Sequence, residues 1–141
     1  MPEKPQDWKI RQYYSRDSVQ ERMLENAEYR EMVPTYDSGF GHRPDAVNFP
    51  GDLEQFVEDG AVAFHGSVER WRNPLLIDES DQDALRSGWD LVIDIDCDPS
   101  FELAKDTARL LVDTLENQFG IEAVGVKFSG NRGFHISVPK S

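Results

Sequence analysis

The second half of this 141-residue chain constrains the fold most, because a strand-like run, a helix-like segment and two more strand-like runs follow one another there. Residues 89–96, WDLVIDID, are largely apolar and β-branched, which is typical of a strand. Apolar residues then recur at helical spacing up to Gly120, a natural helix stop. Residues 123–128 and 134–138 flank the turn SGNRG, which predicts an antiparallel hairpin. This β-α-β-β order can bring the end of the first strand beside the hairpin.

The helix in this half has a predicted start and a predicted apolar face. Asp98 followed by Pro99 is typical of an N-cap and the first helical residue. Asp106 and Asp113 fall off the apolar face, so we expect both to point to solvent. The face itself is predicted to comprise Leu103, Ala104, Thr107, Leu110, Leu111, Thr114, Leu115 and Gln118.

The first half carries a weaker pattern. Its first ten residues include two prolines and are expected to be loose. Ser15, Asp17 or Ser18 is expected to cap a helix, and Pro34 is expected to close it. Residues 35–52 are rich in Gly, Pro and Asp, which predicts an ordered loop. The remaining expected elements are a short helix over 52–60, a strand over 61–68 and an irregular connector over 72–88.

The charge of the chain bears on its partners. Asp and Glu number 27 against 15 Lys and Arg, only five of which are Lys, so the formal net charge is −12. This charge opposes unaided binding to nucleic acid, because neutralisation of phosphates supplies most of that affinity. An acidic, lysine-poor surface is common, and it also fits a salt-loving host, where high salt screens the self-repulsion.

Length, cysteine content and hydropathy restrict the class of protein further. The length suits one compact unit with a real core. The single cysteine, Cys97, excludes an internal disulfide and any multi-cysteine zinc site. No apolar run is long enough to span a bilayer, and the N-terminus lacks the apolar stretch of a signal peptide. We therefore expect a cytoplasmic protein without a membrane partner.

Two aspartates end the first strand of the second half. Asp94 and Asp96 are two residues apart, so their side chains point the same way, with Cα atoms about 6.5–7 Å apart. Carboxylates at this spacing can converge on metal ions, and hard oxygen ligands suit Mg²⁺ or Mn²⁺ with substrate phosphates completing the shell. The alternative is that strand ends often carry Asp, particularly in so acidic a chain.

The hairpin turn gathers groups that suit phosphate. Glycines permit positive φ and close approach of a ligand to the backbone. A planar arginine fork matches phosphate oxygens, and a histidine can donate a hydrogen bond to them. The alternative is an ordinary hairpin loop with a structural histidine. The residues predicted to bind a triphosphate are Lys127, Ser129, Gly130, Arg132, Gly133 and His135.

The pairing of DLVIDID with FSGNRGFHI, preceded by AFHGSVERWRNPLL, resembles the catalytic module of the archaeal–eukaryotic primase superfamily. The likeness is greatest to the small, catalytic subunit of archaeal DNA primase, over roughly residues 60–140. It implies a nucleotidyltransferase that synthesises primers on a single-stranded DNA template from nucleoside triphosphates during DNA replication. It also implies that Asp94 and Asp96 are the first two metal-binding acids, and that Ser129, Arg132 and His135 hold the triphosphate.

The resemblance further implies an α/β (α+β) fold of the primase type. Residues 1–88 would form its N-terminal αβ module, and residues 89–141 an incomplete β-α-β-β catalytic module like an RNA-recognition motif. The third catalytic aspartate of the family lies on a later strand, beyond this hairpin. The chain is therefore expected to be the N-terminal portion of a primase, whether as a fragment, a split-gene product or a truncated paralogue. Its incomplete sheet would leave an unpaired edge strand that invites pairing with another chain.

Two other functions fit the same residues. One is a catalytically incomplete module that binds nucleotide and metal or docks a primase large subunit. The other is the polymerase domain of end-joining ligases, which lies in the same superfamily and carries a similar pattern. The motifs do not distinguish ribonucleotides from deoxynucleotides.

Overall fold

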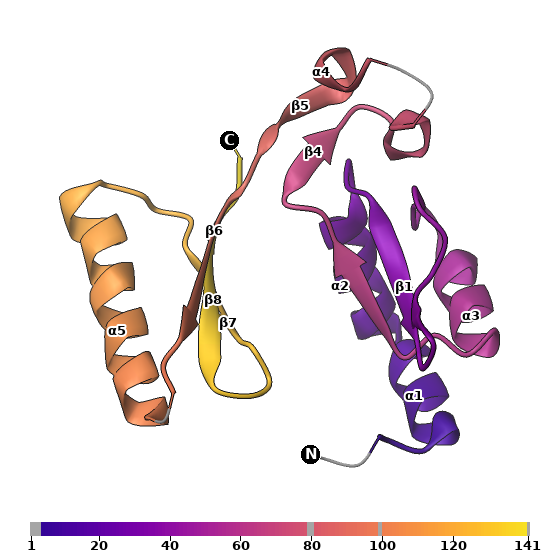
Figure 1. Ribbon diagram of the computed structural model, residues 1–141, viewed down its shortest axis with the longest axis horizontal. Helices are drawn as coiled ribbons and strands as arrows, with labels where there is room; N and C mark the ends of the chain where they lie inside the picture. Colours follow the sequence, from indigo (N-terminus) through magenta and orange to yellow (C-terminus); the bar gives the residue numbers. More distant parts are fainter. Residues whose placement is uncertain (1–3, 79–80, 99, 141) are drawn as a thin grey trace. The chain divides into compact units, whose positions relative to one another are not determined.

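The computed structural model describes residues 4–78, 81–98 and 100–140, which form two compact units, Met1–Ser87 and Gly88–Ser141. Each unit combines helices with strands, and the strand pairs whose register is given are antiparallel, so the predicted α/β (α+β) class is confirmed (Figure 1). Within the described residues, every helix is too short or too polar to cross a bilayer.

The first unit packs three helices with a three-stranded antiparallel sheet of order β2-β1-β3. Its core includes Ala27, Met32 and Leu53, and the rings of Tyr14 and Phe64 meet edge to face beside it. These elements are α1 (Asp7–Tyr14), α2 (Asp17–Ala27), β1 (Met32–Tyr36), β2 (Gly39–Phe40), α3 (Pro50–Glu58) and β3 (Ala63–Gly66).

The structure corrects the expected elements of this unit. Helix α1 lies partly in the segment expected to be loose, and the predicted cap of α2 is wrong because its N-cap is Arg16, with no side-chain hydrogen bond. Pro34 does not close a helix but lies buried in β1. The left-handed φ of 59° at Tyr29 turns the chain after α2, and the residues that follow bury themselves as a strand. Helical spacing of apolar residues alone does not reveal such a turn.

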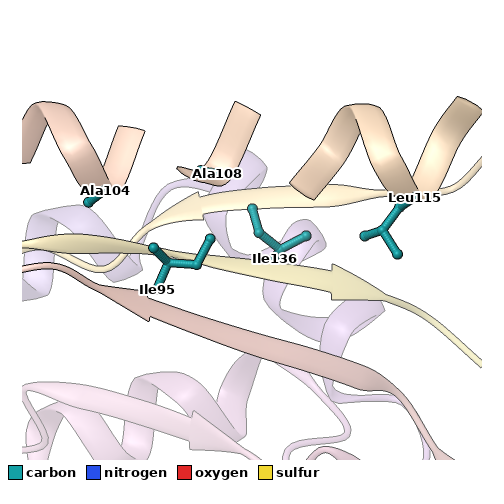
Figure 2. Packing of buried hydrophobic residues seen from close by; sticks show 5 residues of the cluster. All are labelled: Ile95, Ala104, Ala108, Leu115 and Ile136. Atoms are coloured by element: carbon teal, nitrogen blue, oxygen red, sulfur yellow. The ribbon is translucent and has the colours of Figure 1, made fainter. Parts of the chain in front are cut away.

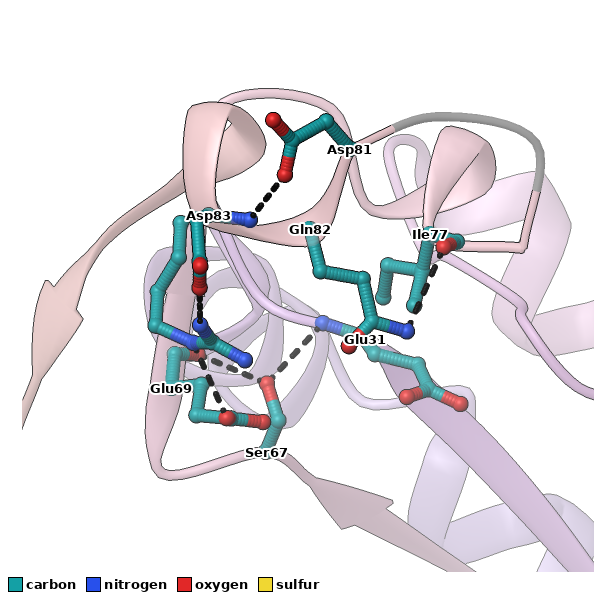
Figure 3. A network of polar contacts seen from close by, with 8 residues as sticks. Glu31, Ser67, Glu69, Ile77, Asp81, Gln82 and Asp83 are labelled. Carbon is teal, nitrogen blue, oxygen red and sulfur yellow. Dashed lines mark hydrogen bonds and ion pairs between the residues drawn. The ribbon is translucent and has the colours of Figure 1, made fainter.

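Hydrogen bonds and ion pairs hold together the part of the first unit that follows β3. Ser67 Oγ accepts from the Glu31 amide at 3.1 Å and donates to the Glu69 carbonyl at 2.8 Å (Figure 3). Arg86 donates to the carboxylates of Glu69 and Asp83 at 3.1 and 2.9 Å. The segment expected to be irregular instead contains short elements: η1 (Pro74–Leu76), α4 (Gln82–Leu85) and the start of β5 (Arg86–Trp89). Strand β5 pairs with β4 (Glu69–Trp71).

The second unit has the predicted β-α-β-β order, and its hairpin is antiparallel as predicted. Strand β8 lies in the centre of the sheet, whose order is β6-β8-β7, and both of its pairings are antiparallel. The elements are β6 (Leu91–Asp96), α5 (Phe101–Asp113), a π-helical turn η2 (Thr114–Gln118), β7 (Gly125–Phe128) and β8 (Gly133–Val138).

Helix α5 covers one face of this sheet. Ala104 and Ala108 face the sheet, where Ile95 and Ile136 form the centre of the core with Leu115 (Figure 2). The predicted apolar face is therefore partly wrong: it missed Ala108 and included Leu103 and Leu110, which are exposed. Alanine at the contact allows the helix axis to approach the strands closely, whereas leucine there would hold it away. Asp106 and Asp113 are exposed, as predicted.

The start of α5 also differs from the prediction. The N-cap is Ser100, whose Oγ accepts a hydrogen bond from the Leu103 amide at 3.2 Å. Asp98 is therefore not the cap, and Pro99 lies outside the described residues. Serine is as good an N-cap as aspartate, so residue preference could not separate the two positions.

Candidate functional site

One row of charged side chains crosses the face of the β6-β8-β7 sheet opposite α5. The register pairs Asp94 of β6 with His135 of β8, and His135 with Lys127 of β7. Because side chains alternate between the faces of a sheet, these three residues and Asp96 share one face, while Ile95 and Ile136 point to the helix. The sheet thus brings the aspartate strand and the hairpin together within a single unit.

The charged groups of this face contact one another directly. His135 Nε2 lies 3.4 Å from Asp94 Oδ1. Arg132 donates from Nη2 to Asp96 Oδ2 at 3.0 Å and from Nη1 to Asp98 Oδ2 at 2.8 Å. We call Asp96, Arg132 and Asp98 the arginine bridge. The side chain of Arg132 is 47% exposed and that of Asp98 67% exposed, so each pair contributes only about 0.2–1 kcal/mol. These contacts are weak enough for a ligand to displace.

The turn itself is held by Ser129. Its hydroxyl donates to the carbonyl of Gly133 at 3.0 Å and accepts from the Gly133 amide at 3.2 Å. Gly130 has a φ of +92°, so the expected positive φ is found there. Gly133 serves a different purpose from the one expected, because a Cβ on it would overlap the carbonyl oxygen of Ile95. Its missing side chain allows β6, rather than a ligand, to approach.

The structure brings together every residue that the sequence predicted for the site, all at or near the hairpin end of the second unit. Their roles in binding stay predictions. Sequence reasoning missed Asp98, which it assigned to the helix cap. The signal was present, since acids recur at every second position in DIDCD and extend the row by one more side chain. The carboxylates and cations of this face nearly balance: three aspartates stand against Lys127 and Arg132.

Two carboxylates of this face are the candidate ligands for a metal ion. Among the residues that the structure describes, no group of three or more His, Cys, Asp or Glu is arranged to hold a metal. Asp94 and Asp96 nevertheless offer two exposed carboxylates on one strand face. They fit a hard divalent cation that takes its other ligands from water and phosphate, as Mg²⁺ does.

The first unit has a separate cavity of about 340 Å³, lined in part by Glu31, Arg43, Glu69, Trp71 and Arg86. Arg43 donates two hydrogen bonds to the buried carboxylate of Glu31, at 2.6 and 2.9 Å, and this pairing raises the pKa of Arg43. Arg86 lies 4.8 Å from the ring centre of Trp71 and pairs with Glu69. The arginines of this cavity are thus bound by its own carboxylates, and none of the predicted site residues lines it.

The chain is similar in sequence to DNA primase small subunits of three archaea. The chain is 31% identical over 134 residues to the DNA primase small subunit of Pyrobaculum islandicum, covering 82% of this chain and 41% of that protein. It is 26% identical over 149 residues to that of Archaeoglobus fulgidus, covering 92% of this chain and 42% of that protein. With that of Haloarcula marismortui it shares 36% identity over 107 residues, covering 62% and 26%.

These similarities relate the chain to the primase superfamily, and within it to the archaeal DNA primase small subunits. No family model matches the chain. The chain spans less than half the length of these three relatives, at most 42%.

Proposed function

We propose that the second unit carries the metal- and nucleotide-binding part of a primase-type nucleotidyltransferase, which synthesises primers on single-stranded DNA from nucleoside triphosphates. One observation carries the proposal: the register places His135 between Asp94 and Lys127 in one row, with Asp96 bridged to Arg132. A metal-chelated triphosphate needs carboxylates and cations side by side, and this face offers both. The relation to primase small subunits supports the same assignment.

In this proposal Asp94 and Asp96 hold Mg²⁺ or Mn²⁺ next to the triphosphate. When bound, the cation lowers the pKa of the attacking 3′-hydroxyl and neutralises charge on the departing pyrophosphate. Arg132 and Lys127 compensate the charge of the phosphate oxygens, and His135 donates a hydrogen bond from the centre of the row. The 3′-oxygen bonds to the α-phosphorus as the bond from that phosphorus to the β-bridging oxygen breaks.

The turn residues have a supporting role. Ser129 closes the turn onto Gly133, which fixes where the backbone of the loop lies. Gly130 has a positive φ, and the space around its Cα is open. The net charge of −12 opposes binding of DNA by the chain alone, so we further propose that a basic partner, such as a primase large subunit, helps to hold the template.

A second function is favoured by one observation: among the residues that the structure describes, no third acid joins Asp94 and Asp96 in a group arranged to hold a metal. A site with two acids and a triphosphate grip can bind a metal-chelated nucleotide without catalysing transfer. In that case the chain is a nucleotide-binding module, or one that docks a primase subunit.

One experiment separates these functions. Binding of ATP and dATP is measured by calorimetry with Mn²⁺ and with EDTA, and primer synthesis is then assayed on single-stranded DNA. We expect Mn²⁺-dependent binding, lost in the D94N/D96N variant. Binding with synthesis supports the enzyme, and binding without synthesis supports the module. Failure to bind either nucleotide with Mn²⁺ would overturn both the enzyme and the nucleotide-binding module.

A further inference from the structure

The arginine bridge joins the candidate metal ligands to a residue outside them. Arg132 uses both terminal nitrogens, one on Asp96 at the end of β6 and one on Asp98 two residues later. We propose that Asp98 is a positioning residue: it holds Arg132 against Asp96 in the metal-free protein, and it retains Arg132 when a divalent cation takes Asp96. This inference rests on the proposed function, since it needs a cation on Asp94 and Asp96.

The guanidinium of Arg132 and a divalent metal ion compete for the carboxylate of Asp96. Arg132 Nη2 lies 3.0 Å from Asp96 Oδ2. A metal ion bound directly by Asp96 would take its ligand from the same carboxylate. Two positive charges a few ångströms apart repel, so a cation on Asp96 weakens the hold of that carboxylate on the guanidinium. The exposed side chains of Arg132 and Asp98 can respond without disturbing the core, because neither packs in it.

Asp98 is suited to hold Arg132 after a divalent cation has bound Asp96. It lies beyond Asp96, the last paired residue of β6, so the sheet does not fix its position. Ser100 caps α5, which leaves the Asp98 carboxylate free of that task. Its bond to Nη1 at 2.8 Å is the shorter of the two and uses a different terminal nitrogen from the bond to Asp96. Arg132 then turns Nη2 toward the phosphates, and cation binding precedes and favours nucleotide binding.

The first test measures the ratio of ATP affinity with saturating Mg²⁺ to that with EDTA, using the 141-residue chain. D98N is expected to lower this ratio by about 2- to 5-fold, as loss of one exposed ion pair would. D98E keeps the carboxylate and is expected to stay near the original ratio. D106N removes the same charge from an exposed position on α5 and is expected to change nothing.

A double-mutant cycle shows whether Asp98 acts through Arg132. D98N also removes a negative charge near the phosphates, and that effect persists in an R132A background. We expect the ratio to fall on D98N only when Arg132 is present. An equal fall in both backgrounds would overturn the proposal and make Asp98 a local charge only.

The second test needs no nucleotide. Rotation of the Arg132 guanidinium is followed by ¹⁵N exchange in NMR. We expect slow rotation without metal, faster rotation on adding Mg²⁺, and fast rotation in D98N under both conditions. Identical rotation in D98N and the original chain without metal overturns the bridge. Absence of ATP binding with Mg²⁺ overturns the proposed function instead, and the NMR result then still decides the role of Asp98.

Discussion

The two faces of the β6-β8-β7 sheet use the same strands for opposite purposes. On the face toward α5, Ile95 and Ile136 are buried in the core of the unit. On the other face, Asp94, Asp96 and His135 are wholly or partly exposed and contact charged groups. Neighbouring residues of one strand therefore contribute either to stability or to the candidate site, seldom to both.

This contrast shows that a single register determines both faces. A shift of one residue in the pairing of β6 with β8 would move the aspartates toward the helix and the isoleucines to solvent. The cost of burying the carboxylates excludes that alternative. The core thus positions the charged row, while the charged row adds little to stability, and substitutions on the two faces should have separable effects.

The largest expected effect is on metal binding, in the D94N/D96N variant. We expect Mn²⁺ binding to be lost, because both carboxylate ligands become amides, while the free energy of unfolding changes by less than about 0.5 kcal/mol. Electron paramagnetic resonance of Mn²⁺ and urea unfolding measure the two. The control D106N/D113N makes the same charge change on exposed positions of α5. Retained Mn²⁺ binding would mean that the ligands lie elsewhere.

On the opposite face, Ile136→Ala should lower the free energy of unfolding by about 2–5 kcal/mol, because it opens a cavity under α5. Ile136 is 1% exposed, whereas Leu110, which is replaced in the control variant L110A, is 68% exposed. Urea unfolding, followed by NMR signals of β8, compares the two variants. Similar losses in both would contradict the assignment of Ile136 to the core.

Gly133→Ala should disturb both faces at once. A Cβ that overlaps the Ile95 carbonyl oxygen forces β6 and β8 apart, with a cost of about 1–3 kcal/mol and weaker ATP binding. Amide hydrogen exchange in the final residues of β6 is the measurement. The control is Gly130→Ala, which strains a φ of +92° but meets no atom within 4 Å. Equal protection of β6 in the two variants would speak against the close approach.

The smallest expected effect on stability is that of Arg132→Ala, which should act on the site alone. ATP affinity in Mg²⁺ should fall by about 10- to 100-fold, since a hydrogen bond to a charged group is worth about 1.5–3 kcal/mol. Stability should hardly change, because the side chain is half exposed. Calorimetry measures the affinity. R132K keeps the charge but loses the planar fork, so its ATP affinity should lie between those of the original chain and R132A. Unchanged affinity would remove Arg132 from the site.

Local patterns predicted the second unit well, and in the first unit they predicted α3 and β3 but not α1 or β1. Strand alternation, the hairpin and the helix stop at Gly120 depend on residues close in the chain, and all were found. In the first unit, the turn at Tyr29 and the burial of Pro34 depend on partners such as Phe64, which are distant in the chain. No pattern local to the segment contains that information.

Two details of the candidate site depended on tertiary contacts in the same way. Helix α5 has two apolar stripes, and packing chose the one with Ala104 and Ala108. Asp98 and Ser100 are both good caps, but Asp98 is bound by Arg132, which is 34 positions further along the chain. The exposed Leu103 and Leu110 show that apolar spacing alone does not tell which stripe faces the sheet.

The sequence by itself determined which residues alternate along each strand, and hence that Asp94 and Asp96 share a face, because the period of a strand is a local property of the backbone. Only the tertiary structure decided that this face also carries Lys127 and His135 in one row, and that Arg132 bridges Asp96 and Asp98. Those facts follow from the pairing of strands far apart in the chain, which burial of Ile95 and Ile136 under α5 selects.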